Sequence, residues 1–191
     1  MKNKAKEAPS SVVVLAVDPG CGHIGWCVLS ITKCQKSGES IPTWIAHGTL
    51  PGRGKVSINA AELSKYVKQY GATLFAIENI AGQWISQLRA ANLVQTAYQA
   101  GYFLGYLAKA FPKLQTAEIP ATKWRKAITG NSHAKDAEIK FALDDIVILG
   151  APKSSNPHNR DACGLALHAG DLYLYPPTPD PMAEPQLPGE P

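Results

Sequence analysis

The sequence predicts a single α/β domain built on a mixed five-stranded sheet, with three antiparallel strands, two parallel strands and flanking helices. Two observations carry this prediction. The apolar segments follow the order βββαβαβα along the chain, and strands that alternate with helices indicate parallel crossover connections. The length of 191 residues suits one ordinary domain with one buried core and is too short for two.

Three successive strands are expected in the first 50 residues. Ser11–Val17 is a continuous run rich in β-branched residues, and Gly25–Thr32 and Thr43–Thr49 follow it after polar turns that contain glycine or proline. Such sequential short strands indicate an antiparallel meander.

Helices and strands alternate in the second half. Gly71 ends the first helix, and Pro112 ends a long second helix. The expected helix, strand, long helix and strand occupy 58–70, 74–80, 84–111 and 115–119, and further helices follow from residue 120.

Both ends of the chain are expected to lie outside the folded domain. Residues 1–11 form a flexible basic arm, and residues 176–191 form a disordered acidic tail in which seven of sixteen residues are proline. The formal net charge of +4 includes three acidic and no basic residues in that tail, so residues 1–175 carry +7. The expected folded domain is residues 12–175, and this basic charge outside the tail fits a nucleic-acid-binding surface.

Composition excludes several classes of protein. No apolar run approaches the roughly 18 residues of a membrane span, and the N-terminus lacks the apolar segment of a secretory signal, so we expect a cytoplasmic protein. Cys21, Cys27, Cys34 and Cys163 form no CxxC pair, which argues against zinc and for reduced thiols.

Two carboxylates stand at the ends of apolar strands. Asp18 begins Asp-Pro-Gly after the first strand, where it either caps a tight turn or serves chemistry. Glu78 ends the apolar run Leu74–Ile77, where it either faces solvent or needs a partner to offset its burial. In the expected topology the fourth strand lies beside the first, so Asp18 and Glu78 would converge.

Two further segments carry candidate residues. His158 and Asp161 are three residues apart at the start of an apolar helix, so their side chains share one face; the alternative is an ordinary helix N-terminus. The segment 122–136 is basic, and its alternative is a solvated helical face. Its basic residues include Lys123, Arg125, Lys126 and Lys135.

These four segments, which follow the family's order along the chain between Val12 and about Gly170, resemble the RuvC family of Holliday junction resolvases. The resemblance implies an RNase H-like fold and a magnesium-dependent endonuclease that resolves four-way DNA junctions by paired nicks during recombination and repair. It implies two Mg²⁺ ions per active site, replaceable by Mn²⁺, with Asp18 as the bridging ligand and Glu78 and Asp161 on opposite sides. His158 stands where the commonest family pattern has a carboxylate, and it would bind metal or poise the attacking water.

The resemblance also implies basic residues at the phosphate, a homodimer and an apolar wedge at the junction centre. Lys135 and Arg125 match the phosphate-contacting positions, and Lys123 and Lys126 of the same segment complete its candidate DNA-binding residues. Trp84 is the wedge candidate, with Ile80 or a core role as alternatives, and Arg89 joins the DNA-binding set. The helix 84–111 carries two stripes suited to a dimer contact or to packing on its own sheet. The stripes are Ala97, Gly101 and Gly105 and, beside them, Tyr98, Tyr102 and Tyr106.

Three rival functions remain open at this point. One is another RNase H-like nuclease that acts on flaps, hybrids or transposon ends, and another is a catalytically silent DNA-binding scaffold, against which four intact ligand positions argue. An actin-like phosphotransferase also ends its first strand with Asp, but this chain has half the length which that architecture needs. We therefore expect branched DNA as the partner, no membrane and no nucleotide cofactor.

Overall fold

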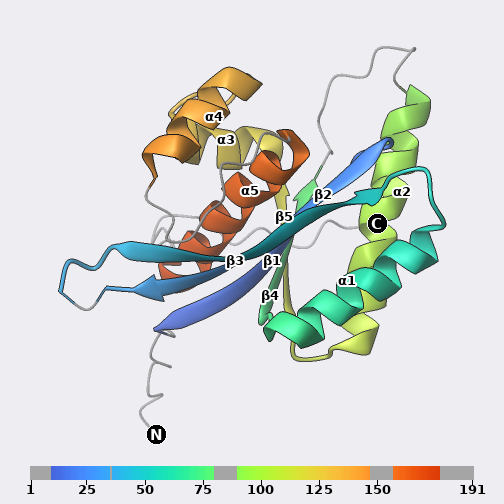
Figure 1. Cartoon of the computed structure of the whole chain (residues 1–191), viewed down its shortest axis with the longest axis horizontal. Helices are drawn as coiled ribbons and strands as arrows, with labels where there is room; N and C mark the ends of the chain where they lie inside the picture. The colour runs from blue at the N-terminus through green and yellow to red at the C-terminus, as the bar shows by residue number, and fades with distance from the viewer. Residues whose placement is uncertain (1–9, 35, 80–89, 147–156, 177–191) are drawn as a thin grey trace, which may run out of the picture.

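A five-stranded mixed sheet forms the centre of the computed structural model, which describes residues 10–34, 36–79, 90–146 and 157–176. The strand order is β3-β2-β1-β4-β5 (Figure 1). The strands are β1 Ser11–Asp18, β2 His23–Lys33, β3 Ser40–Pro51, β4 Leu74–Asn79 and β5 Gln115–Pro120. The helices are α1 Val56–Tyr70, α2 Ala90–Ala110, α3 Ala121–Thr129, α4 Asp136–Asp145 and α5 Pro157–Leu174.

The pairing of the strands confirms the predicted topology. β1 pairs with β2 and β2 with β3 in the antiparallel sense, which makes the expected meander. β4 lies parallel to β1 on one side and to β5 on the other. The fourth strand therefore lies beside the first, as the placement of Asp18 and Glu78 required.

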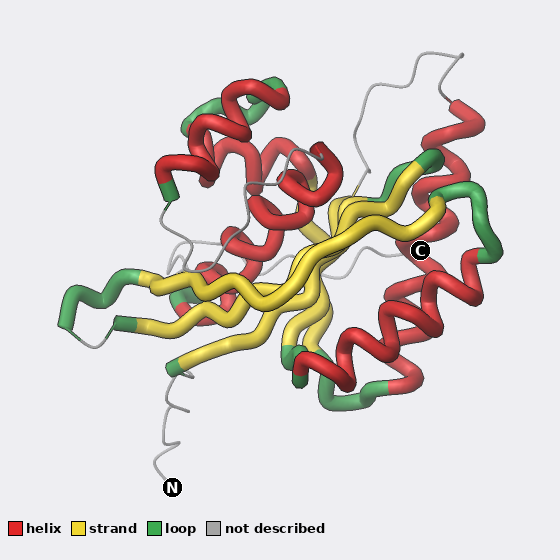
Figure 2. The backbone as a smooth tube through the Cα atoms, in the orientation of Figure 1, coloured by secondary structure: helices red, strands yellow, loops and turns green. Residues whose placement is uncertain are grey.

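Both faces of the sheet are covered by helices (Figure 2). Val14 and Ala16 of β1 belong to the core on the side of α3, α4 and α5, whereas Leu15 and Val17 belong to the core on the side of α1 and α2. Because successive side chains point to opposite faces, a strand covered on both sides is apolar throughout. This explains the uninterrupted apolar run before Asp18.

The observed elements differ from the expected ones mainly in their lengths. β3 is longer than predicted, because it pairs with β2 along the whole range Ser40–Pro51. The predicted helix 84–111 appears as α2, and its residues 84–89 lie outside the described residues, as do Ile80, the arm up to residue 9 and the tail from residue 177. No described helix is long and apolar enough to cross a membrane.

Candidate active site

Asp18 and Glu78 lie side by side at one end of the sheet. The parallel register of β1 and β4 pairs Val17 with Ile77. Asp18 and Glu78 are the next residues on the two strands. Alternation then turns both side chains toward the face covered by α5, since the preceding Val17 and Ile77 pack on the opposite face. The convergence predicted from topology is confirmed by the backbone register.

The first turn of α5 lies directly on the sheet beside these carboxylates. Gly25 of β2 is the register partner of Asp18, and a Cβ at Gly25 would stand 2.2 Å from the carbonyl oxygen of His158. A glycine within a strand often marks such a close approach of another backbone. Because Gly25 has no side chain, the first turn of α5, which carries His158 and Asp161, can lie next to Asp18.

Three contacts join the four candidate residues to one another and to α3. Nδ1 of His158 lies 2.9 Å from Oδ2 of Asp18. The Trp124 indole Nε1–H donates to Oε2 of Glu78 at 3.0 Å, and Nη2 of Arg125 donates to Oδ2 of Asp161 at 3.2 Å. The polar site is thus formed by the ends of β1 and β4, the first turn of α5 and two consecutive residues of α3.

The site concentrates negative charge in a poorly solvated place. Burial and the nearby Asp18 charge raise the pKa of Glu78 to about 7, although Trp124 and Arg125 oppose the rise. Burial and Asp18 likewise raise the pKa of Asp161 to about 6, against the lowering effect of Arg125. The hydrogen bond to Asp18 raises the pKa of His158. All three groups shift toward their protonated forms: the two carboxylates mainly because burial penalises their charge and Asp18 adds to that penalty, and His158 because Asp18 is its hydrogen-bond partner.

These side chains fit a divalent cation by their chemistry. Asp18, Glu78 and Asp161 offer hard carboxylate oxygens, and their mutual repulsion is the property that a bound cation would relieve. Within the described part of the chain, no group of three or more His, Cys, Asp or Glu side chains is arranged to hold a metal ion. One oxygen of each carboxylate instead contacts His158, Trp124 or Arg125, so a bound metal ion would use the other oxygens or replace some of these contacts.

The predicted basic residues are spread over α3 and the start of α4. Arg125 reaches the carboxylates, while Lys123 and Lys126 are exposed on the surface of α3. The charge of Lys123 acts on His168, farther along α5. Lys135 is exposed before the first turn of α4, where its backbone N–H donates to Oε2 of Glu138 at 2.8 Å. Trp84 and Arg89 lie outside the described residues.

Sequence reasoning missed three residues that shape the site. Trp124 and Gly25 were not assigned a role, although a glycine inside a strand was a usable signal for the second. Asp136, the first residue of α4, contributes its charge to the raised pKa values of His158 and Asp161. No sequence signal pointed to Asp136, because its nearness depends on how α4 packs.

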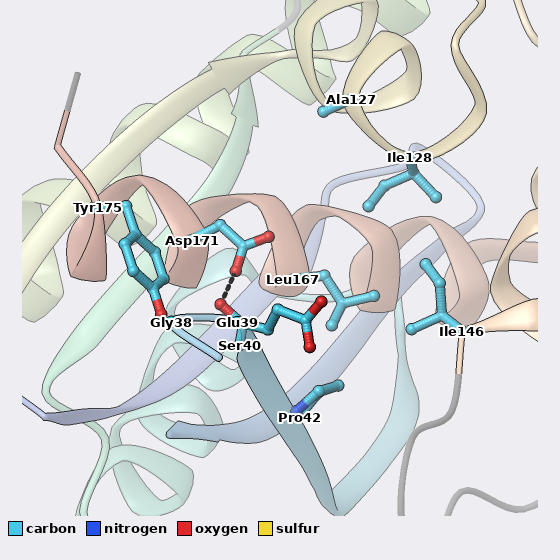
Figure 3. Close-up of a pocket in the computed structure, with 10 residues that line it drawn as sticks. All are labelled: Gly38, Glu39, Ser40, Pro42, Ala127, Ile128, Ile146, Leu167, Asp171 and Tyr175. Carbon is cyan, nitrogen blue, oxygen red and sulfur yellow. Dashed lines mark hydrogen bonds between the residues drawn. The ribbon is translucent and has the colours of Figure 1, made fainter. Parts of the chain in front are cut away.

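The described residues also line two cavities that lie apart from the carboxylates. One, of about 530 Å³, lies between the start of β3, α3 and the second half of α5 (Figure 3). Its wall includes Leu167 and Tyr175, and the Ser40 hydroxyl donates to Asp171 there. The other, of about 420 Å³, is bordered by Val67 and Phe111. Neither contains a candidate catalytic residue.

Comparisons with known proteins agree with this fold. The family described as "Crossover junction endodeoxyribonuclease RuvC" matches residues 14–168. A protein of that name from Parvibaculum lavamentivorans is 26% identical over 171 residues, which cover 85% of this chain and 90% of the relative. A protein of the same name from Wolbachia pipientis wMel is 27% identical over 142 residues, which cover 71% of this chain and 81% of the relative.

Solved structures of similar fold come from Thermus thermophilus and yeast. The Thermus thermophilus RuvC structure has a TM-score of 0.59 at 22% identity, over 81% of this chain and 91% of that one. The same protein in complex with Holliday junction substrate has a TM-score of 0.60 at 23% identity, over 85% and 95%. The yeast mitochondrial Holliday junction resolvase has a TM-score of 0.55 at 12% identity, over 89% and 81%. These likenesses show the RNase H-like fold that the sequence predicted.

Proposed function

The chain belongs to the RuvC family of crossover junction endodeoxyribonucleases, and from that membership we propose that it resolves four-way DNA junctions by paired, metal-dependent nicks. The observation that carries the proposal is the convergence of Asp18, Glu78, His158 and Asp161 at one end of the sheet. These are the residues that the family resemblance assigned from three separate segments of the sequence.

Divalent cations supply the electrostatic part of this chemistry, because they stabilise the entering and leaving oxygens of phosphodiester hydrolysis. Asp18, Glu78 and Asp161 would hold two Mg²⁺ ions per site, with Mn²⁺ as a substitute, since hard oxygen ligands suit both metals. Asp18 Oδ2 orients the His158 imidazole and favours its protonated form. In the proposed reaction His158 either binds the metal or poises the attacking water.

Arg125 has a specific place in the proposed reaction. Its guanidinium donates to Asp161 at 3.2 Å, and it also lowers the pKa of Glu78. With divalent cations beside Asp161, Arg125 would be available to a DNA phosphate, which it suits by charge and by its planar set of donors. We assign Lys135 to the phosphate as well, and Lys123, Lys126, Trp84 and Arg89 to DNA binding.

We further propose that the chain acts as a homodimer through α2. Ala97, Gly101 and Gly105 are exposed, and a Cβ added at either glycine would meet nothing within 4 Å. The alternative, in which this stripe packs on the chain's own sheet, is therefore wrong for these residues. The buried face of α2 is a different one, made by Thr96, Gln99, Ala100, Phe103 and Leu107. Two active sites are what paired incisions require.

A substrate panel tests the proposed function. The protein would be incubated with Mg²⁺ and a synthetic four-way junction, a flap, an RNA–DNA hybrid or linear duplex of the same arm sequences. We expect symmetric paired nicks in the junction and little cutting of the linear duplex. Preferred cutting of flaps or hybrids would assign the chain to another RNase H-like activity, and junction binding without any cutting would indicate a catalytically silent scaffold.

A further inference from the structure

Trp124 contacts Glu78 through a single well-defined hydrogen bond inside the protein. The indole is fully buried and Glu78 is only 6% exposed, so water does not compete for this contact. An indole N–H is a donor only, and a hydrogen bond to a carboxylate is roughly twice as strong as one between neutral groups. The contact therefore fixes Oε2 of Glu78 in one place and leaves Oε1 for another partner.

The surrounding helices hold the indole in this position. On α5, a Cβ added at Gly164 would stand 2.7 Å from the Trp124 ring, so the glycine makes room for the indole face. The Arg125 guanidinium lies over the same ring, 5.3 Å from its centroid. Trp124 also belongs to the core cluster shared by α3, α5 and the sheet. Its ring cannot turn away without displacing that packing.

From these contacts we propose that Trp124 is a positioning residue, which orients the Glu78 carboxylate for the divalent cation through its indole N–H. The inference rests on the proposed function, since it assumes that Glu78 binds the metal. Groups that orient a metal ligand typically contribute 10- to 100-fold to metal affinity or activity. Because Trp124 is fully buried and donates to Glu78, its effect should appear in metal binding and turnover, and not in junction affinity.

The chain offers a matched control. Trp26 of β2 is also a buried tryptophan, but its Nε1 has no hydrogen-bond partner among the described residues, and it packs on the opposite face of the sheet against Tyr66. Trp26→Phe and Trp124→Phe both exchange a buried indole for a phenyl ring. Only Trp124→Phe removes a donor from Glu78.

Mn²⁺ binding to the full chain, followed by the electron paramagnetic resonance signal of free Mn²⁺, tests the proposal. We expect about 10- to 100-fold weaker binding for Trp124→Phe, about wild-type binding for Trp26→Phe, and equal junction binding by all three proteins in EDTA. Equal Mn²⁺ binding by the two folded variants would overturn the inference while leaving the proposed function intact. A wild-type protein that neither binds Mn²⁺ nor cuts junctions would instead remove the proposed function.

A second measurement covers the case in which Trp124→Phe does not fold. In wild-type protein labelled with ¹⁵N, the indole signals of Trp124 and Trp26 can be followed while Mg²⁺ is added. The Trp124 signal should move with the metal and the Trp26 signal should not. A Trp124 signal that stays still while the protein binds Mg²⁺ would overturn the assignment.

Discussion

Gly25 and His158 are in backbone contact: a Cβ on Gly25 would stand 2.2 Å from the His158 carbonyl oxygen and 2.4 Å from its carbonyl carbon. Backbone atoms of a helix cannot yield as a flexible side chain can, so the first turn of α5 must shift if Gly25 acquires a side chain. This turn carries His158 and Asp161, and a shift of about 1 Å in a catalytic group can cost about 100-fold in rate.

We therefore predict that Gly25→Ala reduces junction cleavage by about 100-fold or more and lowers the free energy of unfolding by about 1–3 kcal/mol. Single-turnover cleavage and urea unfolding would measure the two effects. Gly22→Ala is the control, because a Cβ at Gly22 in the same hairpin meets nothing within 4 Å. Wild-type cleavage by folded Gly25→Ala would show that the close approach is unimportant for the site.

Asp18→Asn should abolish cleavage and preserve junction binding. The substitution removes a carboxylate charge but retains the size of the side chain, and it leaves the basic residues of α3 unchanged. Cleavage with Mg²⁺ and electrophoretic binding assays in EDTA would separate chemistry from affinity. If the variant cuts at more than a small fraction of the wild-type rate, Asp18 is not a metal ligand.

The sequence predicted the two strand-borne carboxylates better than the residues around them. Asp18 and Glu78 follow apolar runs, and strand order alone brings them together, since parallel register leaves little freedom. His158 and Asp161 followed from their spacing at a helix start. The roles of Trp124 and Asp136 could not be predicted, because they depend on the tilt and rotation of α3 and α4, which tertiary packing against residues such as Gly164 determines.

The exposed stripe on α2 predicts a dimer that a bulky charge would disrupt. Light scattering at micromolar concentration should show a wild-type dimer, and Gly101→Arg should shift it toward monomer, because the smooth contact surface is lost. Ser57→Arg places the same charge on the exposed surface of α1 and should leave the dimer intact. A wild-type monomer with and without junction DNA would favour a flap-type nuclease over a resolvase.

Trp84→Ala should weaken distortion of the junction more than binding to linear duplex. Trp84 lies outside the described residues, so this prediction rests on the family resemblance. Stacking of an aromatic ring on an unpaired base contributes about 1–3 kcal/mol. Fluorescence of 2-aminopurine at the branch point would report unstacking. Phe141→Ala is a control, since Phe141 is exposed on α4. An undiminished signal in folded Trp84→Ala would eliminate the wedge, and an unfolded variant would place Trp84 in the core.

The buried charge of Glu78 should destabilise the metal-free protein at neutral and alkaline pH. The pKa of Glu78 is raised in the folded state from 4.5 to about 7 by burial and by Asp18. Between these values the folded protein binds more protons than the unfolded chain, so its stability falls as pH rises. Above about pH 7 the full penalty is present, and below about pH 4.5 it is absent.

Glu78→Gln should therefore stabilise the metal-free protein at pH 8 by about 1–3 kcal/mol, while abolishing cleavage. Glutamine retains an oxygen that can accept the Trp124 hydrogen bond, so the variant removes the charge and not the contact. Urea unfolding in EDTA at pH 5 and pH 8 would measure the effect, with Glu62→Gln as the control because Glu62 pairs with Lys65 at the surface of α1. The gain should shrink toward pH 5, where the folded wild type already holds the proton. A variant no more stable than wild type at pH 8 would mean that Glu78 does not carry the buried negative charge that a bound cation is proposed to neutralise.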